Sequence, residues 1–139
     1  MSWTEHSDEG VKYFSGTATY VKQIDITQPA PDQAIWLDLG LVKNLAQVKV
    51  NGRDLGVLWK PPFAVNITPA LKPGANTIEV AITNLWPNRL IGDEKLPEDK
   101  RHTWAGWKHY SKDSPLLPSG LLGPVTIRTA QMVEVLPRP

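Results

Sequence analysis

The sequence predicts an antiparallel β-sandwich, and among such folds it favours the jelly roll. Three observations support this prediction. Eight or so short segments are rich in β-branched and aromatic residues or alternate between apolar and polar residues. Turn-forming clusters separate them, with 13 prolines and 10 glycines in 139 residues. No segment shows the apolar periodicity of an amphipathic helix of three turns.

A β-hairpin around Asn51 and Gly52 is the clearest local signal. Both residues tolerate positive φ, and an Asn-Gly pair between two alternating apolar runs is typical of a two-residue hairpin turn. A lone hairpin is marginal in water, so other strands must cover one of its faces. We expect this buried face to consist of Val48, Val50, Leu55, Val57 and Trp59.

Six further segments are predicted to be strands. They are residues 13–24, 34–39, 63–67, 77–83, 125–129 and 132–136. Residues 84–120, called the excursion below, have no strong period of either kind. A stretch of this length is normally functional or packed by its own aromatic side chains. The sequence therefore predicts a single sandwich domain over residues 1–139 with a long irregular excursion.

The composition narrows the classes of function. Fifteen basic and fourteen acidic residues leave a net charge of +1 without a Lys/Arg run, so we expect no binding to nucleic acid or to a membrane surface. The lack of cysteine excludes disulfides, thiol catalysis and cysteine-based zinc sites. Residues 1–6 lack the basic and apolar regions of a signal peptide, so we expect no targeting segment here, and the compartment stays open.

Several ordered segments resemble a known family of carbohydrate enzymes. YFSGTATY at 13–20, VNG at 50–52 with Leu55, Gly56 and Trp59, residues 62–68, and residues 74–80 look like the sugar-binding jelly-roll domain of family 2 glycoside hydrolases. TNLWPNRLIGD at 83–93 and LLPSGLLGPV at 116–125 are most similar to the galactose-binding-like domain near the C-terminus of family 106 α-L-rhamnosidases. One departure is Asn66, where family 2 domains usually carry Asp.

The resemblance implies a galactose-binding-like fold and a non-catalytic accessory domain of a rhamnosidase-like glycoside hydrolase. Carbohydrate and the catalytic domain of a parent enzyme are the implied partners, and such enzymes are often secreted or periplasmic. In one alternative the domain is purely structural, packs against a catalytic domain and lends loop residues to its active site. A stand-alone glycosidase is the less supported alternative.

The resemblance also bears on assembly. Such domains usually have another strand ahead of the segment matching Ser2 and Trp3, which implies a domain cut from a larger chain. Without that strand one sheet ends in an unpaired edge, and an unpaired edge is a template for pairing with another chain. We therefore expect a homodimer through this open edge. In the alternative, residues 2–10 fold over the edge and the chain stays monomeric.

No catalytic constellation is evident. Glycoside hydrolysis needs two carboxyl groups that face each other across a sugar, about 5 to 9.5 Å apart. The carboxyl candidates are Asp93, Glu94, Glu98, Asp99 and Asp113, and residues 94–101 have the mixed charges of a solvated loop. His6, His102 and His109 have no motif partners. We expect no cofactor, although galactose-binding-like folds often hold a structural calcium ion.

The six tryptophans are the strongest binding signal. Sugar rings stack their apolar faces on aromatic rings, and their hydroxyls need polar partners. Trp36 and Trp59 lie in strand patterns and are expected in the core. The predicted ligand-binding residues are Trp107 and Tyr110 at the centre, with Trp86, Asn88, Arg89, Asp93, Trp104 and His109.

Two alternatives stay open for these residues. The excursion can instead bury its aromatic side chains to anchor itself. Arg89 and Asp93 can form a buried ion pair that fixes the excursion, or belong to a ligand site because a paired guanidinium has spare donors.

Overall fold

The computed structural model of the chain describes residues 1–27 and 29–133. Its strands are β1 (Thr17–Ile26), β2 (Gln33–Asp38), β3 (Leu41–Lys43), β4 (Leu45–Val50), β5 (Arg53–Leu58), β6 (Ala64–Asn66), β7 (Gly74–Thr83), β8 (Gly120–Gly123) and β9 (Thr126–Gln131). Its helical turns are η1 (Trp3–Glu5), α1 (Glu9–Lys12), η2 (Thr68–Ala70), α2 (Pro87–Asp93) and η3 (Glu98–Lys100).

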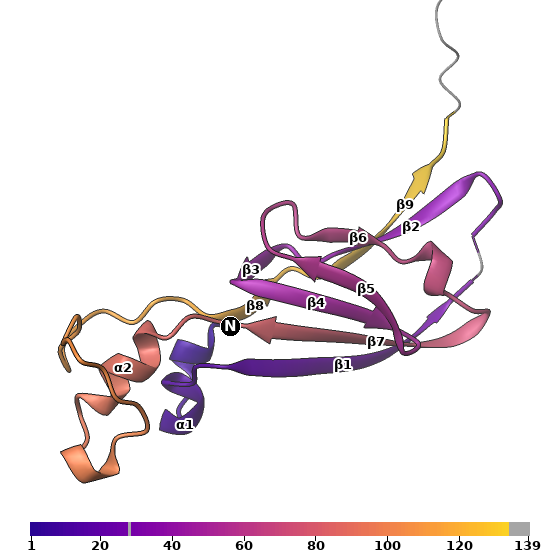
Figure 1. Ribbon diagram of the computed structural model, residues 1–139. Coiled ribbons are helices and arrows are strands. Elements are labelled where there is room, and N and C mark those ends of the chain that lie inside the picture. Colours follow the sequence, from indigo (N-terminus) through magenta and orange to yellow (C-terminus); the bar gives the residue numbers. More distant parts are fainter. Residues whose placement is uncertain (28, 134–139) are drawn as a thin grey trace, which may run out of the picture.

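The strands form an all-β sandwich (Figure 1), as the sequence predicts. One sheet has the order β1-β7-β4-β5 and the other the order β6-β2-β9, while β3 and β8 form a separate two-stranded ladder. Neighbouring strands in each sheet run antiparallel. Helices α1 and α2 and the excursion gather beyond one end of β1 and β7. No helix in the described ranges is long and apolar enough to cross a membrane.

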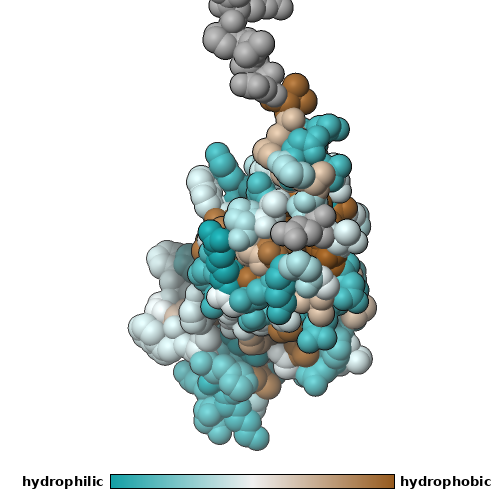
Figure 2. Space-filling view, turned by 90° about the vertical axis from the view of Figure 1, so that its right-hand side faces the viewer, coloured by the Kyte–Doolittle hydropathy of each residue, from teal (hydrophilic) through white to brown (hydrophobic). Residues whose placement is uncertain are grey.

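The core lies between the two sheets. Strand β7 directs every second residue inward, so that Ile78, Val80 and Ile82 are buried, and β2 faces them with Ile35 and Leu37. Full burial of one such side chain stabilises the fold by about 1.5–3 kcal/mol. Figure 2 views the end of the sandwich opposite the helices, where hydrophobic side chains are visible between hydrophilic ones.

The Asn-Gly hairpin is present, but its second strand differs from the prediction. Asn51 and Gly52 have φ angles of 52° and 80°, as a tight hairpin turn requires. The pairing of β4 with β5 then shifts by one residue, with Gly56 at a φ of 98°. Such a bulge reverses the alternation beyond it. The expectation that Val57 and Trp59 are buried is therefore wrong, because both are exposed.

Trp36 was expected in the core and instead lies on the outer face of β2. Its neighbours Ile35 and Leu37 both point inward, and residues of a strand alternate between faces, so Trp36 must point outward. The exposed ring is opposite Asn66 on one side and Arg128 on the other.

The remaining differences concern short elements. Met132 and Val133 follow β9 outside any strand, and the rest of the strand predicted at 132–136 lies outside the described residues. The sequence analysis missed β3 and β8, which have three and four residues and are too short to show alternation. It also missed α2, a helix of seven residues inside the excursion.

Candidate functional site

Helix α2 is fixed at its start by a proline and by a buried amide. Pro87 occupies the first turn, where its missing N–H is not needed. The buried Asn88 side chain accepts a hydrogen bond from the Leu117 N–H (2.8 Å) and donates one to the Leu117 carbonyl (2.7 Å). Asn88, a predicted ligand residue, thus ties the two ends of the excursion together.

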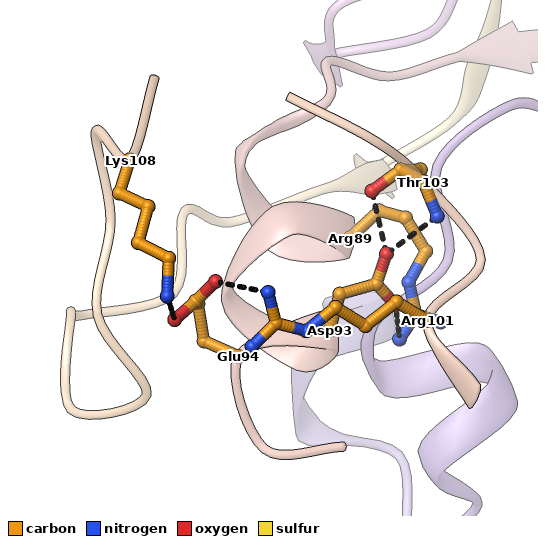
Figure 3. Close-up of polar contacts among 6 residues, drawn as sticks. All are labelled: Arg89, Asp93, Glu94, Arg101, Thr103 and Lys108. Atoms are coloured by element: carbon orange, nitrogen blue, oxygen red, sulfur yellow. Dashed lines mark hydrogen bonds and ion pairs between the residues drawn. The ribbon is translucent and has the colours of Figure 1, made fainter. Parts of the chain in front are cut away.

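Arg89 and Asp93 form a buried ion pair at the end of α2 (Figure 3). The Arg89 Nη2 lies 2.9 Å from Asp93 Oδ1, and the two side chains are 16% and 4% exposed. This contact is an ion pair without the alignment of a hydrogen bond. The other oxygen, Oδ2, accepts hydrogen bonds from the N–H (2.8 Å) and the hydroxyl (2.5 Å) of Thr103. The buried ion pair that one interpretation expects is therefore present, and that it fixes the excursion stays a prediction.

These contacts lower the pKa of the Asp93 carboxyl below its usual value. Burial alone raises this pKa, but the Thr103 hydroxyl, neighbouring backbone N–H groups and the charge of Arg89 together outweigh burial. Asp93 is therefore a carboxylate at neutral pH. A general acid of a glycosidase needs a shift in the opposite direction.

Glu94 links α2 to two later parts of the excursion (Figure 3). Its carboxylate oxygens lie 3.2 Å from Arg101 Nη1 and 3.2 Å from Lys108 Nζ. The Arg101 side chain is largely buried, whereas that of Lys108 is exposed, so solvent screens the second pair more strongly. The predicted solvated loop at 94–101 is thus exposed in its middle and paired at its ends.

The neighbouring face of α2 packs on Tyr13. A Cβ atom on Gly92 would lie 2.7 Å from Tyr13 Cβ and Cγ, so only glycine permits this approach. The Arg89 guanidinium and the Lys95 ammonium lie 6.0 and 5.4 Å from the centroid of the Tyr13 ring.

The tryptophans of the excursion are exposed. Trp104 is 90% exposed, Trp107 74% and Trp86 64%. The alternative in which the excursion buries these rings is therefore wrong for all three. The Trp107 ring stacks on His109, with centroids 5.9 Å apart and planes 16° from parallel.

A small pocket of about 50 Å³ lies between α2 and residues 101–110. The structure brings several predicted site residues to it, namely Asp93, Trp107, His109 and Tyr110, together with Glu94 and Lys108. The other four predicted residues, Trp86, Asn88, Arg89 and Trp104, lie outside its lining. A cavity needs about 10–15 Å³ of such space for each water molecule, so this pocket holds a few waters and a sugar ring does not fit inside. A sugar would have to lie on the exposed Trp107 ring at the rim.

Two contacts were missed in the sequence. Thr103 lies ten residues from Asp93 and carries no local signal. Trp3 is buried and donates a hydrogen bond from Nε1 to the Tyr20 hydroxyl (2.6 Å). Here a signal existed, because Ser2 and Glu5 form a capping box that fixes the turn holding Trp3.

In the described part of the chain, no three His, Asp or Glu side chains come together in a way that could hold a metal ion. A structural calcium ion therefore stays a prediction from the resemblance alone.

The chain is similar to parts of large glycosidases. A curated protein of Formosa agariphila that is named a beta-glucuronidase is 44% identical over 151 aligned residues, which cover 91% of this chain and 13% of the relative. A rhamnosidase structure from Novosphingobium sp. PP1Y is 43% identical with a TM-score of 0.87, over 93% of this chain and 12% of that one. No protein-family model matches the chain.

More distant structures share the fold. A beta-glucuronidase from Lactobacillus rhamnosus is 26% identical with a TM-score of 0.54, over 60% of this chain and 15% of that one. In every case the chain spans a small part of the other protein. It therefore corresponds to a domain-sized portion of larger glycoside hydrolases.

Proposed function

We propose that the chain is a non-catalytic accessory domain of a rhamnosidase-like glycoside hydrolase and that it binds carbohydrate through Trp107 and Tyr110. One observation carries this proposal: the exposed Trp107 ring lies on a segment held in place by Asp93 and Glu94. A sugar stacks on such a ring with its apolar face.

Polar groups for the sugar hydroxyls lie beside this ring. His109 stacks on Trp107, and Lys108 and Tyr110 line the same small pocket. Arg89 and Asp93 act in this proposal by positioning the segment, because their charged groups are buried against each other. An imidazole, an ammonium and a phenol supply both donors and acceptors for hydroxyl groups.

The ion pairs of the carboxyl groups at the pocket support the proposal that the chain is non-catalytic. Asp93 and Glu94 are the acidic residues at the pocket, and each has a cationic partner within 3.2 Å. Neither meets the need for a protonated acid opposite a free carboxylate. The isolated chain should not hydrolyse a nitrophenyl rhamnoside. Turnover that disappears in Asp93→Asn or Glu94→Gln would refute this part of the proposal.

Titration with rhamnose, galactose and plant polysaccharides tests sugar binding. One exposed stacking site should give a dissociation constant of about 0.1 to 1 mM, or about 4 to 5.5 kcal/mol. Trp107→Ala and Tyr110→Ala should each weaken sugar binding about tenfold or more. Trp36→Ala, which removes an exposed ring on strand β2, should not weaken it. If Trp107→Ala and Tyr110→Ala both bind a confirmed ligand with unchanged affinity, the proposed location of the site is refuted. If no sugar binds the unchanged chain, the proposed binding function is refuted.

A purely structural role is the second candidate. Trp104 is 90% exposed, and an exposed aromatic side chain of this kind suits burial against a catalytic domain. In a parent glycosidase, this role predicts that Trp104→Ser lowers the stability of the enzyme. It also predicts that Trp107→Ala lowers kcat/KM although the isolated domain binds no sugar.

Self-association of the isolated chain follows from the same fold. Strand β1 pairs with β7 alone among the described strands, so its other edge is available to a second copy. We propose a homodimer through this edge. Light scattering at several concentrations tests it, and a persistent 15.4 kDa species would refute it. A proline placed in the middle of β1 should abolish the dimer.

A further inference from the structure

The tip of the β4–β5 hairpin is tied to its surroundings through the side chain of Asn51. Its Nδ2 donates hydrogen bonds to the Ala70 carbonyl (2.8 Å) and to Asn76 Oδ1 (2.8 Å). Its Oδ1 accepts one from the Thr77 N–H (3.0 Å), and the Asn51 N–H donates to the Thr77 carbonyl (2.9 Å). The whole amide group of Asn51 is thus engaged by η2 and by the first part of β7.

Asn76, the side-chain partner of Asn51, is completely buried. Its Oδ1 also accepts a hydrogen bond from the Lys72 N–H (2.9 Å). Its Nδ2 donates to the carbonyls of Lys72 (2.9 Å) and Gly74 (2.7 Å). A buried polar network is favourable while all of its members keep their partners and costly when one is lost. The amide of Asn51 is therefore a structural part of this network.

The same side chain is chemically vulnerable because of the residue that follows it. Asn51 is the one asparagine of the sequence that precedes a glycine. A backbone nitrogen that follows asparagine can attack the side-chain amide carbon, and glycine hinders this attack least because it has no side chain. The space beside Gly52 is open, since a Cβ atom built on it would meet no atom within 4 Å.

We propose that Asn51 is a deamidation site that the closed hairpin tip protects and that opening of the tip exposes. In the closed tip, hydrogen bonds to Ala70, Asn76 and Thr77 hold the amide toward η2 and β7. The amide can turn toward the Gly52 nitrogen only after these bonds break. Protection is therefore a property of the hairpin tip, and local opening limits the reaction.

The reaction needs water as its co-reactant and no oxidant. A bond forms between the Gly52 nitrogen and Asn51 Cγ, and the bond from Cγ to Nδ2 breaks. The Gly52 amide proton leaves with Nδ2 as ammonia, and a five-membered succinimide ring remains. Water then adds to one of the two ring carbonyls and opens the ring, which leaves aspartate or isoaspartate at position 51.

The product cannot restore the network. A carboxylate has no N–H donor, and one of its oxygens would stand in the place of Nδ2, 2.8 Å from two other acceptors, the Ala70 carbonyl and Asn76 Oδ1. Isoaspartate also lengthens the main chain by one carbon atom, which does not suit a two-residue turn with φ angles of 52° and 80°. Deamidation therefore makes the opening of the tip permanent.

Peptide mapping by mass spectrometry tests the protection. The unchanged chain and a peptide of residues 48–55 are kept at mildly alkaline pH, each in buffer and in urea that unfolds the chain. In buffer, we expect conversion of Asn51 to be at least about a hundredfold slower in the chain than in the peptide, because three hydrogen bonds must break first. In urea, the two rates should agree. Asn66, which precedes Ile67, is the internal control and should stay unconverted.

Two variants separate local opening from global unfolding. Asn76→Ala removes one acceptor of the Asn51 amide and should raise conversion in buffer by at least about tenfold. Asn84→Ala is the matched control, because Asn84 is also a buried amide, bonded to Phe14 and Gly16 beyond the other end of β7. This control should leave the rate at Asn51 nearly unchanged.

The modified chain tests whether opening becomes permanent. After purification, its Lys72 and Thr77 amides should exchange hydrogen at least about tenfold faster than in the unchanged chain, whereas amides of β2 should not. This measurement and the peptide comparison decide the matter even if Asn76→Ala does not fold.

Four results would overturn the proposal: a peptide that is not converted, equal rates in peptide and folded chain, folded variants that accelerate conversion equally or not at all, and a modified chain with unchanged exchange. The hairpin tip lies at the end of the sheet opposite α2 and the excursion (Figure 1). Sugar binding and deamidation are therefore tested on different residues, and either proposal can fail without the other.

Discussion

Replacement of Asp93 by Asn is the most informative single change, because its carboxylate joins helix α2 to Thr103 in the later part of the excursion. The substitution keeps the shape of the side chain and removes its charge. Arg89, whose side chain is 16% exposed, then keeps its charge without a partner in a largely dry position. Thr103 loses a charged acceptor for its N–H and its hydroxyl.

The expected loss of stability can be worked out from these contacts. Hydrogen bonds to charged groups contribute about 1.5–3 kcal/mol each, and removing one partner of a buried ion pair costs about 3–5 kcal/mol. An Asn oxygen can still accept one bond from Thr103, and partly exposed Arg89 can turn toward solvent. We therefore expect Asp93→Asn to lower the free energy of unfolding by about 3 kcal/mol at pH 7.

Urea unfolding followed by tryptophan fluorescence measures this loss. The matched control is Asp99→Asn, which removes an exposed carboxylate in η3 and should change stability by less than about 0.5 kcal/mol. The double variant Arg89→Gln/Asp93→Asn should recover part of the loss, because the unpaired charge is gone. If Asp93→Asn unfolds at the same urea concentration as the unchanged chain, the ion pair does not hold the excursion.

Three further predictions follow from the same contacts. The pKa of Asp93 is lower in the folded chain than in the unfolded one, so its contribution to the free energy of unfolding is complete above pH about 4 and is lost as the pH falls through the folded pKa. Acid titration should therefore destabilise the unchanged chain more than the Asp93→Asn variant. Ile82→Asn should cost several kcal/mol in urea unfolding by burying an unsatisfied amide, whereas Lys49→Gln should cost little. Gly92→Ala should destabilise the chain by about 1–3 kcal/mol, because its Cβ would lie 2.7 Å from Tyr13. A neutral result in the same urea assay would show that α2 can move away from Tyr13.

The sandwich could be predicted because its signals are local. The Asn51-Gly52 turn and the alternation of β7 depend on neighbouring residues only, and both are found where the sequence places them. The faces of β5 could not be predicted in the same way. One bulge at Gly56 shifts the register, and nothing in an alternating run reveals in advance which residue is the extra one.

The candidate site could be predicted only in part. Arg89 and Asp93 are four residues apart, so a helix brings them together, and their ion pair follows from spacing once α2 is known. The contact of Asp93 with Thr103 and the clamp of Asn88 on Leu117 join residues 10 and 29 positions apart. Contacts of that kind depend on the path of an irregular segment, and its sequence does not determine that path locally.

The exposure of the tryptophans follows from how the excursion is held. A long segment needs either buried apolar side chains or a set of polar contacts to remain in place. Here Asn88, Asp93 and Glu94 supply polar contacts to the segment that returns to β8, so Trp104 and Trp107 are not required as anchors. An aromatic ring on a segment that is already held loses less conformational entropy when a ligand binds. The polar contacts of the excursion thus leave the Trp107 ring exposed, as the proposed sugar site requires.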